Sequence, residues 1–152
     1  MKGFLRNLAL IAVVAFILQG IWEYTVCGLF YTMSNLGHTR LMLSATFGDM
    51  VMSIALYGLL VFVNRDVNWV NKKWRRHDYV ITTLYALFLS FYFEISALQI
   101  ERWGYDPIMP IIPTTPIAFL PVLQLLILLP IIFALTKQLN KKLSSSYKSV
   151  KS

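Results

Sequence analysis

Residues 41–63, LMLSATFGDMVMSIALYGLLVFV, form an apolar run whose only charged side chain is Asp49. A helix of about 20 residues crosses the roughly 30 Å hydrocarbon core of a bilayer, so a run of this length predicts a transmembrane helix. Three other runs have the same character and lie at about residues 8–27, 79–100 and 116–136. The sequence therefore predicts an all-α fold, a four-helix transmembrane bundle over residues 1–136.

The composition agrees with a membrane protein. Hydrophobic residues make up 57% of the chain and charged residues 14%, whereas a soluble domain carries about a quarter charged residues. The net charge of +7 comes from Lys and Arg that flank the apolar runs, which argues against a nucleic-acid-binding face. The single cysteine, Cys27, excludes an intramolecular disulfide and a CxxC pair.

The first run starts like a secretory signal, because Lys2 and Arg6 precede it. The run then continues through residues 19–24 without a small-x-small cleavage site, so we expect it to be retained as the first transmembrane helix.

The distribution of basic residues predicts the orientation. Of the 14 Lys and Arg residues, only Arg40 and Arg102 fall on one side of the predicted membrane. The others flank the opposite ends of the spans, in the loop 64–78 and in a basic tail over residues 137–152. The positive-inside rule therefore places both termini in the cytoplasm. We expect the protein to lie in the inner (plasma) membrane. The end of the tail, SSSYKSVKS, lacks apolar periodicity and is expected to be irregular.

The two outer connections differ in composition. Residues 28–40 mix turn-forming and apolar residues, so we expect this segment to lie along the membrane interface. Residues 102–116, RWGYDPIMPIIPTTP, carry a proline at every third position from 107, which favours a stiff extended strap packed on the outer mouth of the bundle. Tyr31, Trp103 and Tyr105 suit an outer aromatic belt.

Ionisable and amide side chains within the spans gather at one level. Charged groups at membrane depth are costly and usually face the bundle interior or a water-filled cavity. Counting 1.5 Å per residue from the outer helix ends places five such residues in one layer: Gln19, Glu23, Asp49, Glu94 and Gln124. Small residues at spacings of three and four accompany them, which predicts that these faces point inward. The cytoplasmic half of the spans shows no comparable layer.

These residues predict an outward-facing polar, acidic pocket. Asp49, Glu94 and His38 are the candidate catalytic residues, acting as acid, base or proton carrier. The candidate substrate-binding residues are Arg102, Glu23, Gln124, Trp103 and Gln19.

Simpler readings stay open for the same residues. Glu94 and Arg102 can form an interfacial ion pair, and Glu23 lies near enough to the interface to snorkel. A metal site built from His38, Asp49 and Glu94 is chemically sensible, but the tight spacing of known metal motifs is missing, so no metal and no cofactor is assigned.

Several short segments carry a resemblance to a known group. The succession GHTR (37–40), FGDM (47–50), FEIS (93–96), RWGYDPIMPIIP (102–113) and LPVLQ (120–124) resembles small four-span bacterial membrane proteins. The resemblance covers roughly residues 22–130. It implies the four-span architecture and the grouping of His38, Asp49, Glu94, Arg102, Trp103 and Gln124, and it implies no reaction.

Two classes of function follow from the sequence. The first is a membrane protein that binds or acts on a lipidic or small amphipathic molecule at the outer leaflet, with membrane lipid and not nucleic acid as its partner. The residues leave undecided whether it is an enzyme that uses carboxylate and histidine acid–base or metal chemistry. The alternative is an accessory subunit of a larger membrane complex or a small transporter component, and a homo-oligomer would suit so small a bundle.

Overall fold

The computed structural model describes residues 2–32 and 38–149, and four long helices dominate it. They are α1 (Lys2–Trp22), α3 (His38–Asn64), α4 (Arg76–Gln99) and α5 (Phe119–Ser149). All four are long and apolar enough to cross a membrane, over Gly3–Val26, Thr39–Asn64, Arg76–Gln99 and Phe119–Ser145. The predicted four-helix transmembrane fold is confirmed.

Short elements complete the chain. A π-helical turn, Glu23–Cys27, and a short helix α2, Gly28–Phe30, extend α1. Strand β1, Tyr31–Thr32, pairs antiparallel with β2, Gly104–Tyr105. A 3-10 turn, Trp69–Asn71, lies in the connection between α3 and α4.

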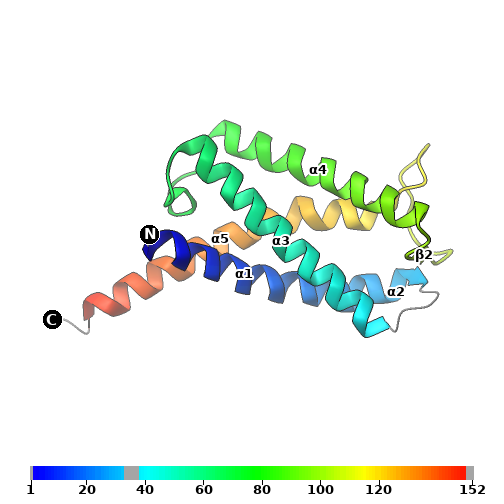
Figure 1. The fold of residues 1–152 in the computed structure, drawn as a ribbon, viewed down its shortest axis with the longest axis horizontal. Helices are drawn as coiled ribbons and strands as arrows, with labels where there is room; N and C mark the ends of the chain where they lie inside the picture. The colour runs from blue at the N-terminus through cyan, green and yellow to red at the C-terminus, as the bar shows by residue number, and fades with distance from the viewer. Residues whose placement is uncertain (1, 33–37, 150–152) are drawn as a thin grey trace.

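The bundle has two distinct ends (Figure 1). Both termini and the connection 65–75 lie at one end, which we call the basic end; the β1–β2 pair lies at the other, which we call the hairpin end. Helix α1 packs against α3 and α5, and α4 packs against α5. Helices α3 and α4 meet at the basic end, touch little elsewhere and diverge toward the hairpin end.

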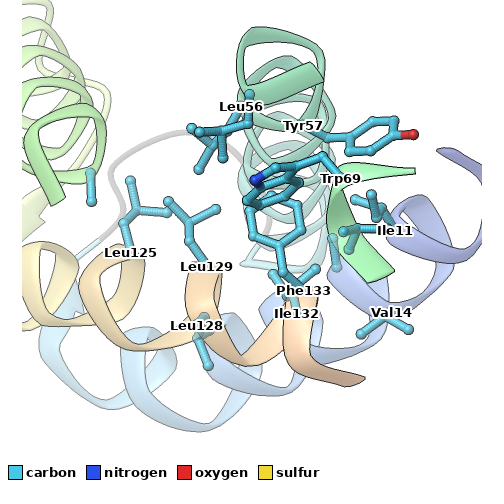
Figure 2. Close-up of a cluster of buried hydrophobic side chains, with 14 residues drawn as sticks. Ile11, Val14, Leu56, Tyr57, Trp69, Leu125, Leu128, Leu129, Ile132 and Phe133 are labelled. Atoms are coloured by element: carbon cyan, nitrogen blue, oxygen red, sulfur yellow. The ribbon is translucent and has the colours of Figure 1, made fainter. Parts of the chain in front are cut away.

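The apolar core joins all four long helices, since Ala86 of α4 is buried in it together with residues of α1, α3 and α5 (Figure 2). Ile11 of α1, Leu56 of α3 and Leu129 of α5 are fully buried in it. Trp69, from the connection after α3, packs edge-on against Phe133 with ring centroids 5.3 Å apart. Because lipid tails are as apolar as these side chains, close packing rather than the hydrophobic effect holds such a core together in a membrane.

Polar side chains are also buried at the basic end, which the sequence did not predict. Asn140 of α5 donates to Asn7 Oδ1 of α1 at 2.9 Å, and Asn7 donates to Tyr57 and to the carbonyl oxygen of Val67. The expectation that this half contains no comparable layer is wrong. Asn7 and Asn140 fall just outside the predicted spans 8–27 and 116–136, but the helices extend past those limits and bury both.

Asp78 explains why α3 and α4 meet at this end. Its two carboxylate oxygens accept from the backbone N–H of Arg75 and from the side-chain amide of Asn64, both at 2.7 Å. The first bond caps the start of α4 and the second ties it to the end of α3.

Two expectations about irregular segments are corrected. The proline-rich segment is a hairpin rather than an extended strap: Ile112 N–H donates to Ile117 O at 2.9 Å, and Phe119 N–H donates to Pro110 O at 2.8 Å. Met109 and Ile117 are buried, so its packing against the bundle is confirmed. The tail is not irregular: α5 continues without a break past the apolar run as far as Ser149.

Candidate functional site

One side-chain amide joins three helices at the level of the predicted polar layer. Gln124 Nε2 of α5 lies 2.9 Å from Gln19 Oε1, 2.8 Å from Glu23 Oε1 and 2.7 Å from Asp49 Oδ2. All four side chains are buried. Four of the five residues that the sequence places in one layer are therefore in contact through Gln124, and they form what we call the amide cluster.

The amide cluster crowds three oxygen atoms around one amide nitrogen. An amide nitrogen carries two hydrogens, so Gln124 cannot donate fully to three oxygens at once. The Nε2 atom of Gln19 is buried and has no hydrogen-bond partner among the described residues. Glu23 sits where α1 changes to a π-helical turn, a distortion that often marks functional sites.

Glu94 lies on α4, and two tyrosines at the hairpin end bind its carboxyl group. Its Oε1 accepts a hydrogen bond from the Tyr31 hydroxyl at 3.1 Å, and its Oε2 accepts a short hydrogen bond from the Tyr105 hydroxyl. Tyr31 and Tyr105 are directly paired across β1 and β2. The indole N–H of Trp103 faces the same carboxylate, but it forms no hydrogen bond with any described residue. The β pair therefore aims two phenols at one buried carboxyl.

Tyr105 keeps its proton in this arrangement. Burial raises the pKa of Tyr105 above its ordinary value, and the hydrogen bond to Glu94 raises it further. The same hydroxyl accepts the backbone N–H of Ala118 at 3.2 Å. Tyr105 thus acts as a donor to Glu94 throughout the physiological pH range.

A cavity of about 350 Å³ is lined both by Glu94 and by residues of the amide cluster. Its polar lining includes Glu23, Asp49, Glu94, Arg102, Trp103 and Gln124. Apolar side chains of α3, α4 and α5 line the rest, and two of them, Val51 and Phe93, are also about half exposed on the outer surface of the bundle. The cavity therefore lies between the diverging helices α3 and α4 and reaches their lipid-facing side.

Arg102 lies at the rim of this cavity. Its Nη2 donates to Ser44 Oγ at 2.7 Å, and its guanidinium lies 5.3 Å from the centre of the Trp103 ring. Within residues 2–32 and 38–149 the ion pair between fully charged groups is Lys72 with Asp66, and His77 Nε2 lies 3.4 Å from Asp78 Oδ1. The Glu94–Arg102 ion pair considered from the sequence is therefore not formed.

Two of the predicted site residues take a different place. Gln19 accepts a hydrogen bond from Gln124 but does not line the cavity, so it positions Gln124 without contacting the cavity itself. His38 begins α3, and its side chain lies outside the described part of the structure, as does residue 37 before it. The role of His38, and a metal site that includes it, stay predictions; the described residues contain no group of three potential metal ligands.

Tyr31 and Tyr105 are the site residues that sequence reasoning placed elsewhere. It assigned both to an interfacial belt, because an aromatic residue near a span end is commonly interfacial. Their contact with Glu94 depends on a two-residue strand pairing between segments more than 70 positions apart. No periodic pattern in so short a pair could have indicated it.

The fold defines a class: a four-helix multi-pass membrane protein, with buried carboxyl groups lining a cavity between its helices. No family model matches the chain, and neither a curated protein nor a solved structure is significantly similar to it.

Proposed function

We propose that this protein binds an amphipathic molecule, taken from the leaflet at the hairpin end, in the cavity between α3 and α4. The positive-inside rule makes this leaflet the outer one. The observation that carries the proposal is the lining: buried polar groups share the cavity wall with apolar, partly exposed residues such as Val51 and Phe93. Such a mixed lining suits a molecule with a polar head and an apolar tail.

The divergence of the helices gives this molecule a route. Helices α3 and α4 touch little, so their facing sides near the hairpin end are not closed against each other. Toward the basic end, the Tyr85 hydroxyl donates to the carbonyl oxygen of Met52 at 2.8 Å and bridges the two helices. A ligand would therefore enter sideways from the bilayer rather than along the bundle axis.

Two glycines of α3 offer a matched test. A Cβ at Gly48 or at Gly58 would meet no described heavy atom within 4 Å, but only Gly48 lines the cavity. Ten residues, or about 15 Å of helix, separate them. Gly48→Leu should fill the cavity, whereas Gly58→Leu places the same side chain elsewhere on the same helix.

Native mass spectrometry of protein purified in mild detergent is the measurement. We expect the wild-type and Gly58→Leu proteins to retain a membrane amphiphile and the Gly48→Leu protein to lose it. Retention by Gly48→Leu at the wild-type level, or no retained amphiphile in any of the three proteins, would refute the proposal. A retained second polypeptide in place of an amphiphile would favour the accessory-subunit alternative.

A further inference from the structure

We propose, building on the proposed function, that the headgroup selected by the cavity is a protonated primary amine carried on an alkyl or acyl chain. The amine would lie between Asp49 and Glu94, and the chain would leave between α3 and α4. The source is either a single-chain amine or the headgroup of an aminophospholipid, since both present the same ammonium.

The charges around the cavity favour a cation. Three carboxyl groups, those of Glu23, Asp49 and Glu94, line it and come from three different helical segments. The one guanidinium in the described lining, Arg102, sits at the rim, where it already contacts Ser44 and Trp103. Buried carboxyl groups in a membrane are stabilised by a positive partner, so an anionic headgroup would add to an existing excess of acid.

Hydrogen bonding favours an ammonium over a hydroxyl. Asp49 shares the two hydrogens of the Gln124 amide with the oxygens of Gln19 and Glu23. Glu94, which also lines the cavity, has one phenol on each oxygen, and a carboxylate oxygen can accept more than one hydrogen bond. An ammonium brings three donors and a compact charge, whereas a hydroxyl brings one donor and another acceptor.

The apolar side of the cavity indicates the rest of the molecule. Val51 on α3 and Phe93 on α4 line the cavity while each is nearly half exposed to the outside, at 47% and 45%. A chain leaving past them enters the bilayer directly. The cavity volume of about 350 Å³ lies at the low end of ligand pockets, so it accommodates a headgroup and the first part of one chain.

The test compares three ligands with the same chain. Wild-type protein in phosphatidylcholine nanodiscs, a bilayer without primary amines, is titrated at neutral pH with dodecylamine, dodecanol or laurate, and bound ligand is counted by native mass spectrometry. The Gly48→Leu protein gives the background of ligand that only partitions into the bilayer. A separate set of nanodiscs containing phosphatidylethanolamine distinguishes the aminophospholipid from the single-chain amine.

Dodecylamine should bind at least about tenfold more tightly than dodecanol, since a hydrogen bond to a charged group is worth more than one factor of ten in affinity. Laurate should bind most weakly. Asp49→Asn and Glu94→Gln should each reduce the preference for the amine, while Glu101→Gln, an exposed carboxyl outside the cavity, should not. Glu94→Gln keeps an oxygen that can accept from the tyrosines, which gives a second variant if Asp49→Asn misfolds.

The outcomes separate this inference from the proposed function. Equal binding of all three ligands above the Gly48→Leu background would refute amine selection and leave amphiphile binding intact. Tightest binding of laurate would also refute it and assign headgroup recognition to Arg102. If none of the three ligands, nor phosphatidylethanolamine, bound above background, both proposals would fail. An amine preference unchanged in both carboxyl variants would overturn the placement of the amine.

Discussion

Replacing Gln124 by leucine removes the amide at the centre of the amide cluster. The nitrogen of this side chain contacts oxygens of Gln19, Glu23 and Asp49 on two other helices, at 2.7 to 2.9 Å. Leucine is similar in volume but donates no hydrogen bond, so the change takes away donors while roughly preserving packing. We expect Gln124→Leu to lower the free energy of unfolding.

The magnitude follows from the number of hydrogens. Interhelical hydrogen bonds in membrane proteins contribute about 0.6 kcal/mol on average and up to about 1.7 kcal/mol. Gln124 has two hydrogens, so at most two of its three contacts are strong at one time. The expected loss in the free energy of unfolding is therefore between about 1 and about 3 kcal/mol. It should lie toward the upper value, because the acceptors left without a donor include carboxyl groups.

Gln138 provides the matched control, since it lies on the same helix and is exposed. The assay is reversible unfolding in mixed micelles of increasing SDS fraction, followed by far-ultraviolet circular dichroism. Gln138→Leu should remain within about 0.5 kcal/mol of the wild type, as most exposed substitutions do. If Gln124→Leu also stays within that range, the amide cluster does not hold the three helices together and our reasoning is refuted.

Two further predictions concern the basic end. Asn140→Leu removes the 2.9 Å bond to Asn7 Oδ1 and should cost about 1 kcal/mol in the same assay, and no loss would show that this network is not stabilising. At Asp66, hydrogen bonds from Lys72 and from the Asn68 backbone lower the pKa, so the group adds stability above its ordinary pKa, and this stability is lost as the pH falls through the lowered value. Asp66→Asn should therefore flatten the loss of stability below about pH 4 and leave the alkaline side unchanged; an acid profile identical to wild type would contradict this.

The spans and the inward-facing residues could be predicted because both depend on local periodicity. A lipid environment forces backbone hydrogen bonds inside each segment, so length and hydropathy alone identify a spanning helix. Residues three and four positions apart share a helix face; of the small residues expected on these faces, Ala15, Ser53, Ser90 and Ala97 are buried and Ala45 is half-buried. The common depth of Gln19, Glu23, Asp49 and Gln124 followed from counting residues along straight helices.

Partner choice within the layer could not be predicted in the same way. The sequence grouped three carboxyl groups. It did not show that Gln124 would bond to Glu23 and Asp49, or that Glu94 would instead accept hydrogen bonds from the β1–β2 pair. That division depends on which helices touch, and α3 and α4 diverge toward the hairpin end. The buried Asn7 was missed because it lies near the end of its helix. There, the hydropathy of the sequence does not show whether a side chain is buried in the bundle or exposed to water.

The amino-acid sequence by itself determined that four helices cross a membrane and that polar groups gather at one level, because each property arises within a single helix. Only the tertiary structure decided that a cavity lies between α3 and α4, that the amide of Gln124 occupies the centre of one polar group, and that two tyrosines hold Glu94. The physical reason is that these features depend on the angles between helices and on a two-residue strand pairing, which side-chain packing between distant segments sets.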